Sequence, residues 1–276
     1  MIDQLVGMAL EAGVAILEVY ERMKPEDARI KGDGSPVTQA DAVAEQIILA
    51  RLAALAPGIP VLAEEAVAAG NTPETQGRSF FLVDPLDGTK EFLSRNGDFT
   101  VNIALIENGV PVLGVVYAPA IGEIFVGGQG ESARRAKVIN GKCDPWKSIQ
   151  VRSAPEKGLK VIASRSHLSD ETRAFIERFP DAEFVSAGSS LKFCRVASGE
   201  ADLYPRLART MEWDIAASDA VLRAAGGSVT DLEGVPMRYG KRDQAGDTDF
   251  ANGWFVVFGD CDRLGHVLRT AMSSAA

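Results

Sequence analysis

Two carboxylates three residues apart, Asp84 and Asp87, have the spacing in this sequence that most directly suggests chemistry. They follow an apolar run at residues 79–83, which is typical of a buried strand. Pro85 restricts the backbone on both of its sides, and Gly88 permits a conformation closed to most side chains. The pattern predicts a stiff loop at a sheet edge. Carboxylates held this close repel each other unless a cation or proton lies between them, so the loop is a candidate site for hard divalent metals, which prefer oxygen ligands.

An ordinary turn would also explain this stretch, because Asp-Pro and Asp-Gly are common turn dipeptides. A metal site would need further oxygen ligands from other elements. Glu64 and Glu65 follow a short predicted strand, in the same way as Asp84. Asp214 precedes an apolar helical segment, where an N-cap role is the simpler interpretation. The backbone carbonyl of Leu86 is a further candidate ligand.

Other common catalytic patterns are missing from the sequence. Its two histidines, His167 and His266, are far apart, and its three cysteines form no CxxC pair. It also lacks a GxSxG elbow, a GxxxxGK[ST] loop and a GxGxxG after a strand, which argues against the common nucleotide-binding folds. A Ser/His/Asp triad stays open, because such triads assemble in space.

Two helical segments precede the acidic stretch. Residues 3–22 have helical periodicity, and a second helix is predicted from Thr38 to the Pro57-Gly58 pair. Thr38 and Asp41 resemble a capping box, which by itself accounts for both residues. Residues 66–77 are predicted to form a surface loop.

Strands dominate the middle of the chain. Asn108-Gly109 is typical of a hairpin turn in a mostly antiparallel sheet. Residues 129–146 are rich in turn signals and are predicted to be hairpin-like. From about residue 150, strands alternate with helices, which indicates an α/β half. We therefore predict an α+β subdomain over residues 1–150, which contains the metal-binding loop, and an α/β subdomain over residues 151–276.

The totals for the whole chain restrict its partners. The 276 residues, 46% of them hydrophobic, can build one large domain or two fused subdomains. A net charge of −9 and a pI near 4.9 argue against binding a nucleic-acid polymer. The chain has no basic signal-peptide region and no apolar run near the ~18 residues of a membrane span. We expect a cytoplasmic protein without membrane insertion; a peripheral contact with the inner face of the cell membrane stays open, as does the choice between monomer and homodimer.

Three motifs occur in a specific order: Glu64-Glu65, VDPLDGT at residues 83–89 and WDIAA at residues 213–217. Together they resemble the signature of the inositol monophosphatase superfamily of Mg²⁺-dependent, lithium-sensitive phosphatases. Lys90-Glu91-Phe92 and further stretches resemble the 3′(2′),5′-bisphosphate nucleotidase branch. These stretches are residues 95–105, 114–119, 164–167, 188–194 and 203–206. The resemblance implies a layered αβαβα sandwich of the inositol monophosphatase and fructose-1,6-bisphosphatase type.

The resemblance also implies a metal site with two or three Mg²⁺ ions. Glu64, Asp84 and the Leu86 carbonyl would hold one ion, while Asp84 would bridge to a second ion held by Asp87 and Asp214. Two cations ~4 Å apart can clamp the attacking and leaving oxygens of an in-line displacement. Glu64, Leu86, Asp87 and Asp214 are expected to form part of the substrate site as well.

By the same resemblance, Asp41 and Thr89 form the pair that orients and deprotonates the attacking water. The capping-box interpretation of Asp41 would then be incomplete, because the same carboxylate serves two roles. The backbone amides of Gly88 and Thr89 are expected to contact the phosphate as oriented dipoles.

A second anion site is also implied. Ser189, Lys192 and Arg206 resemble the residues that hold the 5′-phosphate of a nucleotide, and His167 is expected to line the nucleoside pocket. Solvated surface charges are the alternative interpretation of Lys192 and Arg206.

We therefore expect an enzyme of sulfur metabolism that converts 3′-phosphoadenosine 5′-phosphate to AMP and phosphate, with the 5′-phosphosulfate form as a further candidate substrate. The alternative is an inositol or sugar monophosphatase of the same superfamily. A third hypothesis is a catalytically inactive protein that binds Mg²⁺ or a nucleotide; the retained acidic residues argue against it.

Overall fold

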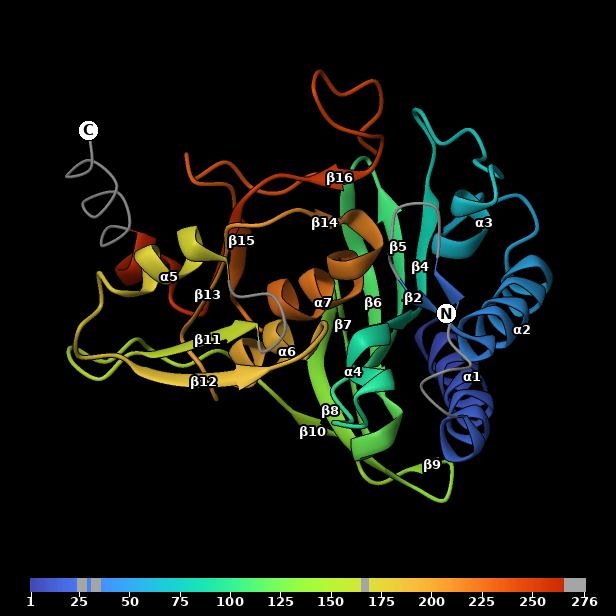
Figure 1. The fold of residues 1–276 in the computed structure, drawn as a ribbon, viewed down its shortest axis with the longest axis horizontal. Coiled ribbons are helices and arrows are strands. Elements are labelled where there is room, and N and C mark those ends of the chain that lie inside the picture. Colours follow the sequence, from blue (N-terminus) through green and yellow to red (C-terminus); the bar gives the residue numbers. More distant parts are fainter. Residues whose placement is uncertain (24–28, 31–35, 165–168, 266–276) are drawn as a thin grey trace.

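The computed structural model describes residues 1–23, 29–30, 36–164 and 169–265. Residues 261–265 are helical, and the α-helices that lie wholly within these ranges are α1 Ile2–Arg22, α2 Gln39–Leu55, α3 Glu64–Ala68, α4 Thr89–Leu93, α5 Asp170–Ile176, α6 Leu191–Ala197 and α7 Glu212–Ala224. Helices α1 and α2 cover one face of the larger sheet, and α6 and α7 lie between that sheet and the smaller one (Figure 1). Helix α5 packs on the outer side of the smaller sheet. The predicted αβαβα layering is confirmed.

The larger sheet has the order β10–β8–β7–β6–β5–β4–β3, with β9 paired to β8. Its strands are β3 Val61–Ala63, β4 Phe80–Asp87, β5 Thr100–Glu107, β6 Val110–Ala118, β7 Glu123–Gly128, β8 Glu131–Ile139, β9 Lys142–Cys143 and β10 Lys147–Ser148. Strands β3 and β4 are parallel, and the other neighbours are antiparallel. Asn108 and Gly109 join β5 to β6 with φ of 51° and 73°, as the hairpin prediction requires.

The smaller sheet has the order β12–β11–β13–β17–β15. Its strands are β11 Lys160–Ser164, β12 Glu183–Ala187, β13 Leu203–Arg206, β15 Ser228–Thr230 and β17 Phe255–Phe258. Strands β12, β11 and β13 are parallel, whereas β17 is antiparallel to both of its neighbours. Two short pairs complete the strands: β1 Arg29–Ile30 with β2 Pro36–Val37, and β14 Thr210–Met211 with β16 Ala251–Asn252.

The two N-terminal helices are stabilised in different ways, α1 by its apolar face and α2 also by a cap at its first turn. Helix α1 buries Leu5, Ala9 and Ile16 against the sheet. Helix α2 begins with the predicted capping box: the Thr38 side chain accepts from the Ala40 amide at 3.1 Å, and the Asp41 carboxylate accepts from the Thr38 amide at 2.8 Å. The capping interaction therefore positions Asp41 at the start of the helix.

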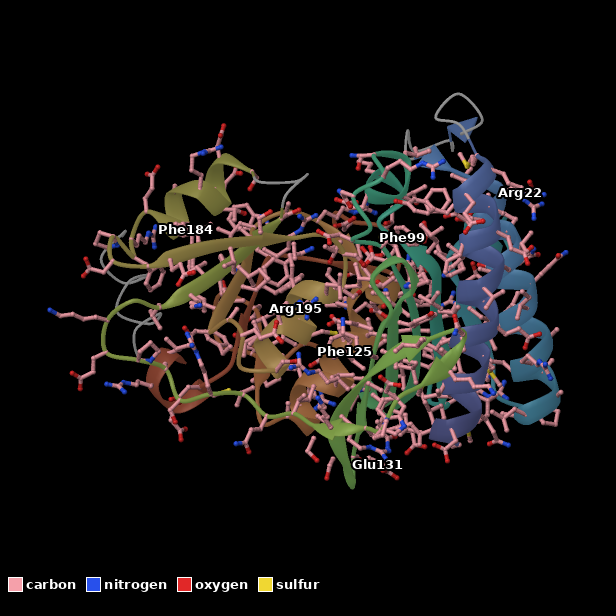
Figure 2. All side chains as sticks on the ribbon, turned by 90° about the horizontal axis from the view of Figure 1, so that it is seen from below. Arg22, Phe99, Phe125, Glu131, Phe184 and Arg195 are labelled. Carbon is pink, nitrogen blue, oxygen red and sulfur yellow. The ribbon has the colours of Figure 1, made fainter. Side chains whose placement is uncertain are left out.

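Helix α7 joins the two sheets into one core. Its side chains pack on β4 to β8 on one side and contact α6 on the other. Gly114 on β6 allows a close approach, because a Cβ there would lie 2.1 Å from the Ala217 carbonyl oxygen. Figure 2 shows Arg195 of α6 near Phe125 of β7, and the guanidinium lies 5.9 Å from the ring centroid. The second half of the chain thus packs directly on the sheet formed by the first half.

Two local predictions were wrong. The expected loop at residues 66–77 begins inside helix α3, whose first-turn acids suit a helix N-terminus. Helix α7 begins at Glu212, so Asp214 is at the third helical position and accepts from the Met211 amide at 2.8 Å. Asp214 is therefore not the N-cap. The hairpin-like character predicted for residues 129–146 is confirmed, because the nine-residue strand β8 pairs antiparallel with both β7 and β9.

Candidate active site

A cavity of about 450 Å³ lies where β4 ends and where α4, α6 and α7 begin. Residues from α4, α6, β13 and the first turn of α7 line it. Eight of the predicted site residues are on its wall: Glu64, Asp87, Gly88, Thr89, Ser189, Lys192, Arg206 and Asp214. The structure therefore brings together residues that lie up to 150 positions apart in the sequence.

The acidic stretch is a bulged strand end and not a separate loop. Strand β4 continues to Asp87, and its pairing with β5 shifts by one residue between Asp84 and Asp87. Gly88 then takes a φ of 93° and turns the chain into α4. The sequence prediction placed the strand end too early, because a bulge keeps the strand paired past Pro85.

The four predicted carboxylates crowd together below and beside the cavity. Asp84 is 1% exposed, and its Oδ1 accepts from the Leu86 amide at 3.0 Å. Burial raises the pKa of Asp84 well above its usual range, and the charges of Glu64, Asp87 and Asp214 raise it further. Burial also raises the pKa of Asp214 well above its usual range, reinforced by Asp87 and Glu64. The cluster concentrates negative charge that a bound cation would neutralise.

The donor set fits a hard divalent cation, because it consists of carboxylate and carbonyl oxygens. As they stand, the described residues contain no group of three His, Cys, Asp or Glu side chains arranged to hold a metal. The hydrogen bonds of Asp87 help to explain this. Its Oδ2 accepts from the Ser189 hydroxyl at 2.6 Å and from the Ser190 amide and hydroxyl at 2.8 and 2.9 Å. Metal binding would exchange some of these hydrogen bonds for coordination.

Asp41 and Thr89 meet at the cavity edge from α2 and α4. The Thr89 hydroxyl donates to Asp41 Oδ1 at 3.4 Å. The other oxygen of this carboxylate, Oδ2, accepts from the amide and the hydroxyl of Thr38 at 2.8 and 2.7 Å. The capping box thus uses one oxygen of Asp41 and leaves the other to accept from Thr89, so the cap is confirmed and the role of Asp41 in deprotonating water stays a prediction.

Two basic residues, Lys192 and Arg206, line the same cavity as the carboxylates. Lys192 is only 6% exposed, and its Nζ donates to the Ser189 carbonyl at 2.6 Å. Its Nζ also lies 5.3 Å from the ring centroid of Tyr204. Burial lowers the pKa of Lys192 to about 8, and the nearby charge of Arg206 lowers it as well, against the opposing effect of Asp87. The interpretation of Lys192 as a solvated surface charge is wrong, because the side chain is buried.

Sequence reasoning missed two residues at this site, Ser190 and Tyr204. Ser190 is 2% exposed and donates its hydroxyl to the Asp214 carbonyl at 2.6 Å, which connects β4, α6 and α7. Its position next to Ser189 in a Gly-Ser-Ser run was the available signal. Tyr204 gave no signal, because its contact with the Lys192 ammonium depends on the pairing of distant elements. The predicted nucleoside residue His167 lies outside the described residues.

Comparison with known proteins identifies relatives over most of the chain. The inositol monophosphatase family model matches residues 1–253. Relatives from Shigella flexneri and Escherichia coli (strain K12), both called 3′(2′),5′-bisphosphate nucleotidase CysQ, are 46% identical over 243 residues. These matches cover 88% of this chain and 95% of each relative.

Solved structures agree with this similarity. CysQ from Bacteroides thetaiotaomicron, described as a bacterial member of the inositol monophosphatase family, has a TM-score of 0.74 and 38% identity, covering 93% of this chain and 97% of that one. The IMPase from Thermotoga maritima has a TM-score of 0.77 at 24% identity, covering 99% of this chain and 98% of that one. The second likeness supports the fold alone.

Proposed function

Because the chain belongs to the inositol monophosphatase family, we propose that it is a metal-dependent phosphomonoesterase acting on a nucleotide bisphosphate. The reaction is hydrolysis of the 3′-phosphate of 3′-phosphoadenosine 5′-phosphate to AMP and phosphate, with the 5′-phosphosulfate form as a second substrate, in sulfur metabolism. The name of the 46% identical relatives supports this substrate class. The observation that carries the proposal is a single cavity lined by both an acidic cluster and the buried Lys192.

The proposed metal ligands are the crowded oxygens at the base of the cavity. Glu64, Asp84 and the Leu86 carbonyl would hold one Mg²⁺, and Asp84, Asp87 and Asp214 a second, with a total of two or three ions. Bound Mg²⁺ supplies positive charge for the phosphate oxygens and lowers the pKa of a bound water. The raised pKa of Asp84 supports this assignment, since the cluster in the metal-free chain lacks the charge that would keep it ionised.

The chain's own residues would position the water and the reacting phosphate. The Thr89 hydroxyl, which donates to Asp41 at 3.4 Å, would accept a proton from the water as it passes its own proton to Asp41. The amides of Gly88 and Thr89, at the left-handed turn into α4, would donate to the phosphate oxygens. Asp41 is suited to the role of base because its other oxygen is held by Thr38.

The second phosphate of the substrate would bind at the opposite wall. Lys192 and Arg206 would pair with its charge, and the Ser189 hydroxyl would add a hydrogen bond. An inositol monophosphate has one phosphate and would leave this wall without an anion. We propose His167 as part of the nucleoside pocket, from the family resemblance alone.

We extend the proposal to a cytoplasmic enzyme that acts on small-molecule phosphate esters. It would act as a monomer or a homodimer, and its two subdomains would divide near residue 150. In the described part of the chain, no helix combines the length and the apolar character of a membrane span. Peripheral membrane contact has no support among the relatives and is not part of the proposal.

A phosphate-release panel tests the proposal. The purified chain would be assayed with Mg²⁺ on 3′-phosphoadenosine 5′-phosphate, inositol monophosphate and fructose bisphosphate, each with and without Li⁺. We expect the highest kcat/KM for the nucleotide bisphosphate, and inhibition by Li⁺. A preference for inositol monophosphate would replace the proposal with the monophosphatase alternative, and no phosphate release from any of the three would leave only a binding protein.

A further inference from the structure

Asn102 on β5 has a buried amide whose donor end is unsatisfied. The residue is 1% exposed, and within the described part of the structure its Nδ2 has no hydrogen-bond acceptor. A buried amide donor without an acceptor is unfavourable and uncommon in folded proteins. The position of Asn102 in the sheet suggests which group this donor serves.

Asn102 lies directly beside the proposed bridging ligand. In the register of β4 with β5, Asn102 pairs with Asp84. Residues directly opposite in an antiparallel pair have side chains on the same face, with Cβ atoms ~4.5–5.5 Å apart. Leu82 lies two residues before Asp84, and Ala104 lies two residues after Asn102, so their side chains are on this same face. Both belong to the core cluster that includes Ala217 of α7. Asn102 and Asp84 therefore share the face that α7 covers.

The side-chain oxygen of Asn102 already accepts a hydrogen bond. The Thr100 hydroxyl donates to Asn102 Oδ1 at 3.3 Å. The Thr100 hydroxyl also contacts the Ser189 hydroxyl, which in turn donates to Asp87. The Asn102 oxygen is thus engaged by Thr100, whose hydroxyl also contacts Ser189. What remains is the Nδ2 donor, on the face that carries the Asp84 carboxylate.

We propose that Asn102 is a positioning residue for Asp84: its Nδ2 donates to the carboxylate when the site holds a divalent cation. This inference rests on the proposed function. The Leu86 amide already donates to Asp84 Oδ1 at 3.0 Å. A second donor from the neighbouring strand would fix the orientation of the carboxylate that the proposed function assigns to the metal site. Removing a group that hydrogen-bonds to a metal ligand typically weakens metal binding ~10–100-fold.

An isosteric pair of variants tests the inference. Asn102→Val removes the donor, and Asn102→Thr has the same shape but keeps a hydroxyl donor; both are good strand formers. Mn²⁺ affinity is measured from the electron paramagnetic resonance signal of the free ion, without substrate. We expect N102V to weaken Mn²⁺ binding ~10-fold or more and N102T to recover much of the loss. Asn102→Leu is the second apolar variant if N102V does not fold.

Val116→Ala is the matched control. Val116 pairs with Asn102 from the other side, on β6, and is fully buried in the same core. V116A should lower the Tm and leave Mn²⁺ affinity unchanged. The inference is wrong if the apolar variants bind Mn²⁺ within about twofold of the parent, if N102V and N102T are equal, or if V116A loses as much affinity as N102V. Failure of the parent chain itself to bind Mn²⁺ or release phosphate would instead reject the proposed function.

Discussion

Lys192 is a buried cation at the edge of an acidic cluster. Its pKa is lowered to about 8, first by burial and then by the charge of Arg206, while Asp87, Glu91 and Asp98 act in the opposite direction. The free chain is therefore close to losing this charge at mildly alkaline pH. A phosphate bound beside Lys192 would stabilise the charged form.

The substrate preference should therefore depend on pH. Lys192 contributes to phosphate binding only when protonated, so its contribution is present below pH 8 and is lost as the pH rises through about 8. We expect the kcat/KM for the bisphosphate, divided by that for a monophosphate ester, to fall between pH 7 and 9.5. Taking the ratio removes titrations common to both substrates, such as that of a metal-bound water.

Lys192→Ala provides the control for this pH profile. Loss of a charged hydrogen bond of ~1.5–3 kcal/mol corresponds to roughly a 10- to 150-fold lower ratio near neutral pH. In K192A the ratio should no longer change across pH 8. A parent ratio that stays flat, or a K192A ratio that keeps its slope, would contradict the assignment.

The start of helix α2 shows how one element can serve two purposes. Thr38 and Asp41 close the capping box, and Asp41 also accepts from Thr89 of α4. The helix N-terminus therefore fixes the carboxylate more firmly than a loop would. Its structural and chemical contributions can be separated, because they use different oxygens.

Two variants should separate these contributions. Asp41→Asn keeps the shape and an acceptor oxygen for the cap but removes the base, so kcat should fall by ~10²-fold or more with little change in unfolding free energy. Thr38→Ala should cost ~0.5–2 kcal/mol of stability through the lost cap and reduce kcat much less. Urea unfolding and phosphate release measure both. Equal kcat losses in the two variants would indicate that Asp41 acts only through the helix.

At the scale of the whole molecule, α7 makes the site depend on contact between the two halves of the chain. One core cluster includes Leu82 and Phe125 of the larger sheet, Ala217 of α7 and Val257 of the smaller sheet. Asp214 lies in the first turn of α7. The position of this proposed metal ligand therefore depends on how closely α7 packs on β6. The division near residue 150 stays a prediction; a shared core of this kind predicts that the halves unfold together.

Gly114→Ala should disturb both stability and metal binding. The new Cβ would lie 2.1 Å from the Ala217 carbonyl, so α7 must move away from the sheet. Overpacking of this kind costs ~1–3 kcal/mol. We expect a lower Tm together with weaker Mn²⁺ binding.

Gly7→Ala is the matched control, because no atom lies within 4 Å of a Cβ at that position in α1. It should leave metal binding unchanged and stabilise the helix by ~0.5–1 kcal/mol. If G114A lowers the Tm without changing Mn²⁺ affinity, the packing of α7 does not control the metal site.

Local sequence determined the parts of this protein that depend on near neighbours. The capping box at Thr38 and the Asn108-Gly109 hairpin were predictable because each depends on residues within a few positions. The order of acidic motifs and the resemblance of Lys192 and Arg206 to an anion site identified the side chains that line the cavity. These signals are present in the one-dimensional order of residues.

The tertiary structure decided what depends on the pairing of distant strands and helices. The bulge between Asp84 and Asp87 exists only in the register with β5, and the same register places Asn102 beside Asp84. Ser190 reaches Asp87 only because α6 packs next to the end of β4. A surface charge stayed open as the alternative for Lys192 because burial is a property of the packed core and not of the local sequence. Contacts across such distances arise from three-dimensional packing, which short-range patterns do not encode.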